Sequence, residues 1–444
     1  MTINYKNIGL FFLVACLILG TGFVQSWNTA LFILNMGLVS AIMALGVNLQ
    51  WGFAGLFNVG IMGFVALGGL AAVLVSMPPT TEAWAAGGLH VIFGLILGAA
   101  TVTGAILVQI RMAVGRARTL TTIAILIGGF VIFRAVFDGG VAAVEAVDAA
   151  GTGYLGGLNF GGANYKDWGF MTLISWPVGG VLAAGVAWLI GKTALSLRSD
   201  YLAIATLGIS EIIIAVMKNE DWLSRGVKNV IGLPRPVPYE IELQESARFI
   251  ERTTALGLDT VTTSSIVVKL GYAGLFSIVL VIILILAQLA LASPWGRMMR
   301  AIRDNEDAAE AMGKNVTSRH LQIFILGSAI CGVAGAMMTT LDSQLTPSSY
   351  QPLRFTFLVW VMVIVGGSGN NFGSVLGGFL IFFLWVQVEP MGAILMQVLT
   401  AGMAEDNGLR LHLLDSVAHM RLLTMGLILI LVLRFAPKGL IPEK

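Results

Sequence analysis

One acidic side chain lies near the middle of a long apolar segment. Glu211 is the only charged residue between positions 201 and 217. An ionisable group at the centre of a lipid bilayer costs about 2.5–3.5 kcal/mol on insertion scales, so it marks a functional site by default. Thr206 and Ser210 lie within about one helical turn of it, on or near the same predicted face. Two roles stay open: a polar wall along a path for solutes, or hydrogen bonds that hold neighbouring helices together.

A second set of polar residues lies in a glycine-rich segment nearer the N-terminus. Asn48 and Asn58 flank a run that contains Gly52 and Gly55. Because each glycine weakens a helix by about 1 kcal/mol relative to alanine, the run predicts a broken or re-entrant helix. Inside a membrane such backbone is tolerated only where it lines a cavity, and it could hydrogen-bond a small zwitterion. Close packing of helices through glycine is the alternative of equal weight.

A similar glycine-rich run, 366–371, lies in the opposite half of the chain. It contains Ser368, and the same two interpretations apply to it. Together with the run around residues 46–60, it indicates a weak internal repeat.

The polar segment 292–320 predicts two short helices in succession. Ser293 and Pro294 are typical of a helix start, with serine as the N-cap and proline in the first turn. Arginines then recur at every third position and would share one face of this first helix. They are Arg297, Arg300 and Arg303.

The second helix of this segment is expected over residues 306–312. Asp304 or Asn305 would cap its N-terminus. Glu306 and Asp307 suit the first turn, because the helix dipole is positive there.

The end of the second helix completes a compact elbow that projects from the membrane. Gly313 is a good C-terminal cap, after which Thr317 or Ser318 would begin the next apolar segment. The elbow displays Ala308 and Ala309, flanked by charge, and such small side chains let another protein approach closely. The alternative is an ordinary polar loop whose arginines extend to lipid phosphates.

The composition excludes most soluble classes of protein. Of the 444 residues, 57% are hydrophobic and only 11% are charged, whereas an ordinary soluble domain is about 25% charged. The mean hydropathy is +0.87. So few charges could not cover a soluble surface, which excludes a cytosolic enzyme, a nucleic-acid binder and a disordered chain. We expect an all-α, polytopic transmembrane helical bundle that forms a single domain over residues 1–444.

Hydropathy predicts twelve apolar segments that approach the roughly 20 residues a spanning helix needs. They are 8–26, 30–49, 53–76, 89–110, 120–137, 173–191, 201–217, 271–291, 321–341, 355–366, 375–396 and 421–436. Several are short or interrupted by glycine, so ten or eleven full crossings are expected.

The distribution of Lys and Arg predicts the orientation. One side of the membrane would carry 14 of these residues, and the short loops of the other side would carry 4. Arg134 lies at the edge of a segment, and the remaining 7 lie in the long loop 218–270. Because cytoplasmic loops carry the excess of positive charge, both termini and the elbow are expected in the cytoplasm.

Three longer segments would then lie outside, at 138–172, 218–270 and 397–420. They either connect spans or meet a soluble partner. Within them, 240–252 is expected to form a short surface helix and 409–421 an amphipathic stretch.

No catalytic centre, metal site or cofactor is expected. Cys16 and Cys331 lie in apolar runs, and the four histidines lack metal-ligand spacing. Gly191-Lys192-Thr193 resembles the end of a nucleotide-binding loop, but the glycine five residues earlier is missing and no strand precedes it. We therefore expect a chain that is not an enzyme and carries no ATPase of its own.

The elbow resembles the EAA signature of ABC-importer permeases. Asp307-Ala308-Ala309 and Gly313 match that signature, with aspartate replacing glutamate. Ile323 falls at the family's spacing, but the Leu-Pro pair that follows there is absent. The resemblance therefore points away from the maltose- and phosphate-type permeases.

The wider stretch 293–306 is similar to the branched-chain amino acid permeases of the LivM type. Further stretches agree with that family. They are 44–60, 200–212, and 366–378 together with 437–440. The similarity covers most of residues 40–440 and thins in the three external segments.

This resemblance implies a permease subunit of an ATP-driven ABC importer for leucine, isoleucine or valine in the bacterial inner membrane. The implied partners are two ABC ATPase subunits, a second, homologous permease subunit and a periplasmic substrate-binding protein, with no nucleic acid. The resemblance implies that the elbow contacts the ATPases through Arg300, Arg303, Glu306, Asp307, Ala308, Ala309 and Gly313. The residues expected along the substrate path are Asn48, Gly52, Gly55, Asn58, Thr206, Ser210, Glu211 and Ser368.

Other cargoes and mechanisms stay open at this stage. Urea, short amides and other amino acids are alternative cargoes. An ion-coupled secondary transporter would need intramembrane carboxylates, for which Glu211 and Glu389 are candidates. A membrane-embedded enzyme would need clustered His, Asp or Cys at one depth, and the sequence has no such cluster.

Overall fold

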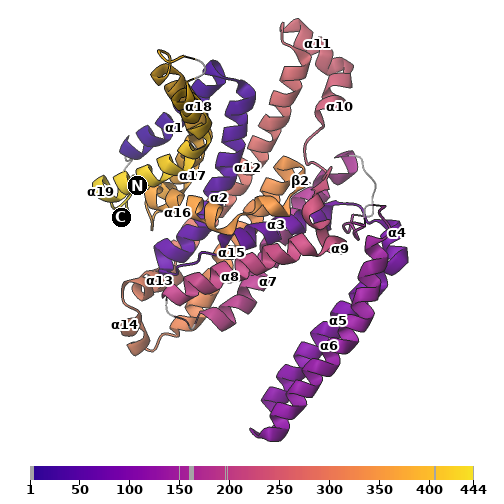
Figure 1. The fold of residues 1–444 in the computed structure, drawn as a ribbon. Coiled ribbons are helices and arrows are strands. Elements are labelled where there is room, and N and C mark those ends of the chain that lie inside the picture. The colour runs from indigo at the N-terminus through magenta and orange to yellow at the C-terminus, as the bar shows by residue number, and fades with distance from the viewer. Residues whose placement is uncertain are drawn as a thin grey trace.

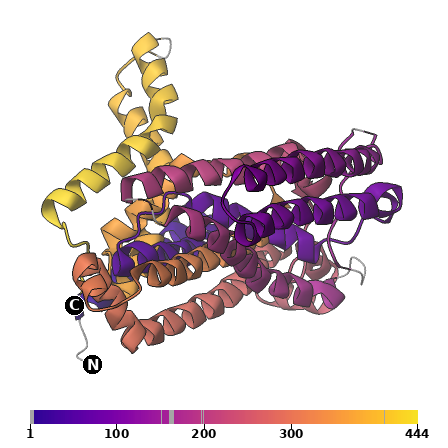
Figure 2. The same cartoon turned by 90° about the horizontal axis from the view of Figure 1, so that it is seen from below.

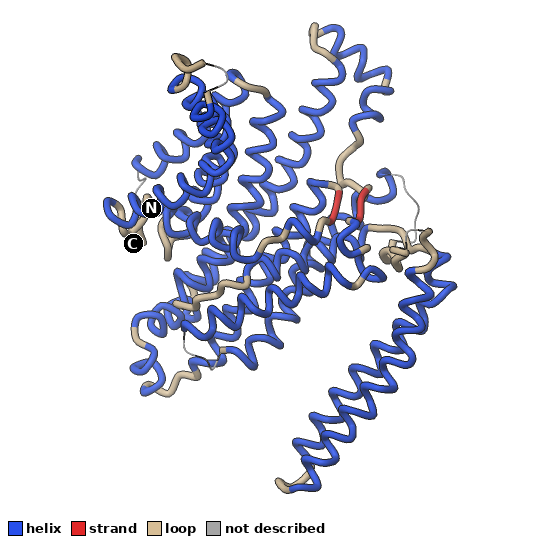
Figure 3. Tube along the Cα trace, viewed as in Figure 1, coloured by secondary structure: helices blue, strands red, loops and turns tan. Residues whose placement is uncertain are grey.

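The computed structural model describes residues 5–149, 151–159, 165–195, 197, 199–404 and 407–443, apart from the side chains of 165–168. Almost all of this chain is helical, and its strands form one short pair (Figure 3). The all-α fold class expected from the composition is confirmed.

Ten helices of the described chain are long and apolar enough to cross a membrane. They are α1 (Tyr5–Val24), α2 (Trp27–Ala54), α5 (Leu89–Arg111), α6 (Arg116–Glu145), α7 (Tyr165–Ala194), α8 (Ser199–Asn219), α12 (Thr260–Ala292), α15 (Val316–Asp342), α17 (Asn371–Leu399) and α19 (Met420–Phe435). By length and composition, this number of candidate spans agrees with the lower of the two expected numbers of crossings. The span of α5 also includes α4 (Thr81–Ala83) and the π-helical turn η1 (Trp84–Gly88), and that of α19 includes α18 (Gly408–Asp415) and the 3-10 turn η4 (Ser416–His419).

Two further apolar helices are shorter, and both adjoin a glycine-rich break. α3 (Ile61–Ser76) follows the end of α2, and α16 (Pro352–Gly366) precedes α17. Two of the twelve apolar segments are thus too short to count as full spans, because the backbone leaves the helix at the glycine runs.

The most tightly packed part of the bundle surrounds α15, which contacts α2, α3 and α7. Glycines bring the backbones together there. A Cβ at Gly68 would overlap the carbonyl of Gly332, and one at Gly335 would overlap the carbonyl of Val65. In a membrane, where lipid is as apolar as leucine, such close approach is a main source of helix association.

Two parts of the molecule lie at the periphery of this bundle. α5 and α6 pack on each other and extend outward as a hairpin with exposed apolar side chains (Figure 1). The hairpin is anchored at one end by a separate apolar cluster that includes Phe137 and Trp222, the latter from α9 (Asp221–Ser224). At the other end of the chain, α18 and α19 lie at the edge of the bundle (Figure 2, yellow), where both contact α17 and α19 also contacts α16. Their apolar faces suit lipid or another membrane subunit.

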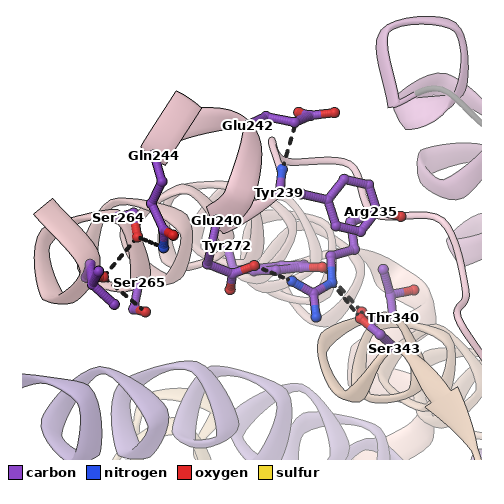
Figure 4. A network of polar contacts seen from close by, with 11 residues as sticks. Arg235, Tyr239, Glu240, Glu242, Gln244, Ser264, Ser265, Tyr272, Thr340 and Ser343 are labelled. Atoms are coloured by element: carbon purple, nitrogen blue, oxygen red, sulfur yellow. Dashed lines mark hydrogen bonds and ion pairs between the residues drawn. The ribbon is translucent and has the colours of Figure 1, made fainter. Parts of the chain in front are cut away.

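A third projection consists of α10 (Glu240–Glu245) and α11 (Ala247–Ala255), which precede α12 (Figure 1). Its base is fixed by Arg235, whose Nε donates to Ser343 Oγ at 2.6 Å and whose Nη1 contacts Glu240 Oε2 at 2.8 Å (Figure 4). Gln244 adds a hydrogen bond to Ser264 of α12 at 2.8 Å. Burial raises the pKa of the Tyr239 hydroxyl beside this network, although the Arg235 charge opposes the rise.

A two-stranded antiparallel sheet lies next to Arg235 and closes the same end of the bundle. β1 (Val230–Ile231) pairs with β2 (Gln344–Leu345), with Val230 opposite Leu345. The pairing ties the segment before α10 to the end of α15.

The three segments expected to be external contain more helix than hydropathy predicted. α6 continues to Glu145 and α7 begins at Tyr165, so the segment 138–172 is largely helical at both ends, with residues 160–164 outside the described part. α12 begins at Thr260, and α17 continues to Leu399. Hydropathy marks only the apolar core of a span, whereas helices continue through the polar interface. The surface helix expected at 240–252 is present as two helices, α10 and α11, which meet at Ser246. The stretch 409–421 is helical as α18 and η4, but α18 buries no side chain, so its amphipathic character stays a prediction.

Candidate functional site

The break between α2 and α3 is held closed by buried side-chain amides. α2 ends at Ala54, and Gly55 takes a left-handed conformation with φ +69°. Asn58 donates to Gln50 Oε1 at 2.9 Å and accepts from the Gly60 N–H at 2.9 Å. Gln50 in turn donates to Ser328 of α15 at 3.1 Å. The polar groups freed by the break are thus satisfied inside the protein.

The break between α16 and α17 meets the same end of α2. Asn48 donates to Asn371 Oδ1 at 3.0 Å and accepts from the Gly369 N–H at 2.8 Å. A Cβ at Gly52 would overlap both Asn48 Oδ1 and the nitrogen of Gly369. The two glycine-rich runs, about 320 positions apart in sequence, are therefore in direct contact, while Ser368 is exposed at the edge.

Both predictions of a broken helix are confirmed, and close packing through glycine is confirmed at the same place. Asn48 and Asn58 are 0% and 1% exposed. Their side chains fill the junction between the breaks and do not line an open cavity in this conformation. An unpaired buried amide costs about 1–3 kcal/mol, so this closed arrangement is strongly specified.

Helix α8 is attached to the first break by Thr206. The Thr206 Oγ1 donates to the Ala203 carbonyl at 3.0 Å and accepts from the Val59 N–H at 3.1 Å. Ser210, one turn later, packs against Gly63 of α3, and its hydroxyl is buried without a hydrogen-bond partner among the described residues. Both side chains face α3.

Glu211 points away from that face, which corrects the expectation that it shares one with Thr206 and Ser210. Consecutive helical positions differ by about 100°, so a residue next to the buried Ser210 turns outward. Glu211 is exposed, as are Ile204 and Ile212 on either side of it along α8. The structure therefore places an intramembrane carboxylate on the surface of the chain.

The elbow has the two expected helices, α13 (Pro294–Asp304) and α14 (Glu306–Ala311). Pro294 occupies the first turn, but the Ser293 hydroxyl donates to the Ala290 carbonyl and caps nothing in α13. Of the two candidates for the second cap, Asn305 is correct: its Oδ1 accepts from the Ala308 N–H at 2.9 Å. Gly313 ends the elbow at φ +76° with open space around it.

The start of the next helix differs from the prediction. Asn315, and neither Thr317 nor Ser318, caps α15 by accepting from the Ser318 N–H at 2.9 Å. The helix thus begins at Val316, one turn earlier than the apolar pattern indicates, because asparagine is at least as good an N-cap as serine or threonine.

The three arginines of α13 form hydrogen bonds with different parts of the protein. Arg297 and Arg300 donate to the carbonyls of Ala292 and Leu291 at 3.2 and 3.4 Å, which satisfies the last turn of α12. Arg303 turns inward and donates to the Gly52 carbonyl at 2.5 Å. Burial lowers the pKa of Arg303, but hydrogen bonds to acidic neighbours outweigh that effect and raise it overall.

The tip of the elbow is free for contact with another molecule. Glu306, Asp307, Ala308 and Gly313 are exposed, Ala309 is half-buried, and the apolar side chain of Met312 is 79% exposed. This is a small, acidic-edged surface with an apolar centre. No group of His, Cys, Asp or Glu in the described residues could hold a metal ion.

A family model described as "branched-chain amino acid transport system / permease component" matches residues 149–433. This range includes α8, the elbow and the break before α17. The chain belongs to this family of permeases. Its relatives are permease proteins, and with its ten apolar helices the chain is a multi-pass membrane protein.

Curated relatives are similar in sequence to this permease over part of their length. LivM of the Escherichia coli high-affinity branched-chain amino acid transport system is 29% identical over 226 residues, 49% of this chain and 51% of that protein. A probable LivM of Methanocaldococcus jannaschii is 28% identical over 35% of this chain and 41% of its own. The fructose import permease FrcC of Rhizobium meliloti is 26% identical over 22% and 28%. The chain thus spans about half the length of these curated relatives or less, and no solved structure matches it.

Sequence reasoning missed two polar residues of this permease's central junction. Gln50 links Asn58 to α15, and Glu443 contacts Arg303 at 2.9 Å. Gln50 was detectable, because an amide inside an apolar helix needs a partner. Glu443 was not, because nothing in a short C-terminal segment indicates where it folds back.

Proposed function

We propose that this chain is a permease subunit of an ATP-driven ABC importer, with branched-chain amino acids as its cargo. The observation that supports this most directly is the elbow: a capped pair of short helices with an exposed small-residue surface, inside the range that matches the permease family. ATP hydrolysis then belongs to two partner subunits, and a binding protein delivers the substrate from the opposite side.

In this proposal the elbow tip docks on an ATPase subunit. Ala308 and Ala309 allow close backbone approach, while Glu306 and Asp307 offer carboxylates for cationic side chains of the partner. Gly313 reverses the chain at φ +76°, a conformation that glycine adopts without strain. Arg300 and Arg303 fix the elbow to α12 and α2, so a push on the tip reaches the bundle as a rigid movement.

The substrate path lies in this proposal along the exposed face of α8, at the boundary with a second, homologous permease. An unpaired carboxylate in lipid is costly, so the exposed Glu211 needs a polar environment that this chain alone does not supply. A path that lies between the two permeases supplies this polar environment, and the Glu211 carboxylate can then attract the ammonium group of an amino acid. Thr206 and Asn58 link this wall to the two helix breaks, whose closed state would block the path.

Purification followed by reconstitution tests the proposal. The chain is solubilised from native membranes in mild detergent, and co-purifying proteins are identified by mass spectrometry. The complex is then placed in proteoliposomes with internal ATP, and uptake of radiolabelled leucine is measured with the binding protein outside. We expect recovery of an ATPase pair with a second permease, and leucine uptake that requires ATP. Recovery of the chain alone with gradient-driven, ATP-independent uptake would refute the importer and favour an ion-coupled transporter.

A second cargo class is supported by one observation. A short stretch of this chain is similar to a fructose import permease. Competition by unlabelled isoleucine, valine, urea, acetamide and fructose in the leucine assay separates these cargoes, since only a true substrate or close analogue displaces the label at low concentration.

A further inference from the structure

The C-terminal segment 436–443, here called the strap, folds back onto the break between α16 and α17. The Leu440 and Ile441 N–H groups donate to the carbonyls of Val365 and Gly366, both at 2.9 Å. Asn370 donates to the Pro442 carbonyl at 3.0 Å. Ile441 is 2% exposed, so the strap is held by an apolar anchor as well as by backbone hydrogen bonds.

The glycines of the break are shaped to this strap. Gly367 has φ +123°, and a Cβ there would overlap the carbonyl of Ile441. Gly369 has φ +80°, and a Cβ there would lie 2.8 Å from Glu443 Oε2. Gly367 therefore needs glycine for two reasons, the backbone conformation and the proximity of the strap backbone, whereas Gly369 needs it for its backbone conformation.

The elbow joins the strap at one side chain. Arg303 Nη1 contacts Glu443 Oε2 at 2.9 Å and the Gly52 carbonyl, at the end of α2, at 2.5 Å. Asn48, one turn earlier in α2, binds Gly369 of the break. Four segments thus meet within hydrogen-bonding distance: α13, the strap, the last turn of α2 and the break before α17.

We propose that Glu443 is a positioning residue, through which the strap transmits movement of the elbow to both helix breaks. Besides the buried apolar side chains of Met299 and Ile302, α13 makes hydrogen bonds to α12 through Arg297 and Arg300 and to α15 through Trp295, but these bonds reach neither the strap nor the helix breaks. Nη1 of the Arg303 guanidinium donates to the Gly52 carbonyl and to Glu443 at once, while Nε and Nη2 donate to Asp304, so the planar group has a defined orientation. A displaced elbow must pull on α2 and on the strap together. This inference rests on the proposed importer function.

Glu443→Gln in the assembled complex tests the inference, with Asp304→Asn as the matched control. Both carboxylates contact Arg303, at 2.9 and 3.0 Å, but Asp304 is its neighbour on α13 and links it to no other segment. We expect Glu443→Gln to lower leucine uptake per ATP hydrolysed by about three- to tenfold, the range for loss of a partly exposed charge-assisted hydrogen bond. ATP hydrolysis and the KM for the loaded binding protein should stay within about twofold of wild type, and Asp304→Asn should leave all three unchanged.

A double-mutant cycle separates positioning from general damage. If Glu443 acts through Arg303, the variant carrying Arg303→Gln and Glu443→Gln is no worse than Arg303→Gln alone. Hydrogen exchange gives a readout independent of transport: peptide 436–443 should exchange faster in Glu443→Gln and at the wild-type rate in Asp304→Asn.

Equal uptake per ATP in Glu443→Gln and wild type would overturn the inference, as would equal impairment in Glu443→Gln and Asp304→Asn. Failure of the proposed function has a different signature, because the wild-type complex itself would then lack ATP-dependent uptake. Unchanged hydrogen exchange of the strap in Glu443→Gln would also count against the inference, whatever the transport result.

Discussion

Asn48→Ala is the substitution that tests most directly whether the two helix breaks support each other. The Asn48 side chain is fully buried and makes two hydrogen bonds across the junction, to Asn371 and from Gly369. Alanine removes both and leaves the Gly369 N–H and the side-chain Oδ1 of Asn371 without these partners. At about 1–3 kcal/mol for each unpaired buried group, less what relaxation in the membrane recovers, we expect a loss of about 2–4 kcal/mol.

Asn35→Ala is the matched control, in the same helix and with the same burial. Asn35 is also 0% exposed, but its amide makes one hydrogen bond, donating to the Lys269 carbonyl at 2.9 Å. That carbonyl belongs to α12 and can still accept a hydrogen bond within the helix, so we expect the free energy of unfolding to fall by about 1 kcal/mol. Both substitutions remove the same atoms, and the cavity contributions largely cancel in the comparison.

Denaturant titration in mixed detergent micelles measures the difference. Asn48→Ala should be less stable than Asn35→Ala by about 2 kcal/mol, which corresponds to roughly a 30-fold change in the folded-to-unfolded ratio. Uptake should fall in Asn48→Ala and persist in Asn35→Ala, because only the former loosens the breaks. Equal free energies of unfolding for the two variants would refute the reasoning that Asn48 holds the junction.

Four further substitutions, with one control, probe the elbow, the exposed carboxylate and the projection. Ala309→Asp or Gly313→Asp should uncouple uptake from ATP hydrolysis without changing membrane insertion. The control Ala401→Asp, on the opposite side of the membrane in the predicted orientation, should leave uptake coupled. Normal uptake in a correctly inserted Gly313→Asp protein would refute the coupling role of the elbow. Glu211→Gln keeps the shape of the side chain and removes its charge, so uptake should fall severalfold, and wild-type transport would mean that the charge is dispensable. Arg235→Met breaks the contacts to Ser343 and Glu240, and limited proteolysis should then cut near α10 and α11 sooner than in wild type while the apolar helices stay intact.

The elbow and the breaks are predictable because their signals are local. A cap, a run of helix formers and a left-handed glycine act within one or two turns, so α13, α14 and the end at Gly313 follow from neighbouring residues. The glycine runs likewise predict that the helix stops. The same local logic placed Ser293 correctly at the N-cap of α13 but did not show that its hydroxyl donates back to Ala290. It failed at Thr317 and Ser318, because Asn315 caps α15 in their place.

What the sequence does not give is the set of partners across the bundle. Glycine runs far apart indicate two breaks, but their contact through Asn48 depends on how α2 and α17 pack. The direction in which Glu211 points could not be predicted from the sequence either. Its helix has apolar residues all round, so periodicity cannot distinguish the side toward α3 from the side toward lipid or another subunit.

The closed junction constrains how a path could open in this permease. The amides of Asn48, Gln50 and Asn58 have partners inside the protein, and Asn58 also receives the indole N–H of Trp360 on its backbone carbonyl at 3.1 Å. Opening therefore requires these groups to exchange one partner for another, because leaving them unpaired would cost several kcal/mol in a low-dielectric interior. A zwitterionic substrate carries the donors and acceptors for that exchange, whereas an apolar solute does not. A movement of the elbow that pulls on Gly52 and Gly369 together would act where those hydrogen bonds lie, so the energy source and the substrate would operate on the same set of contacts.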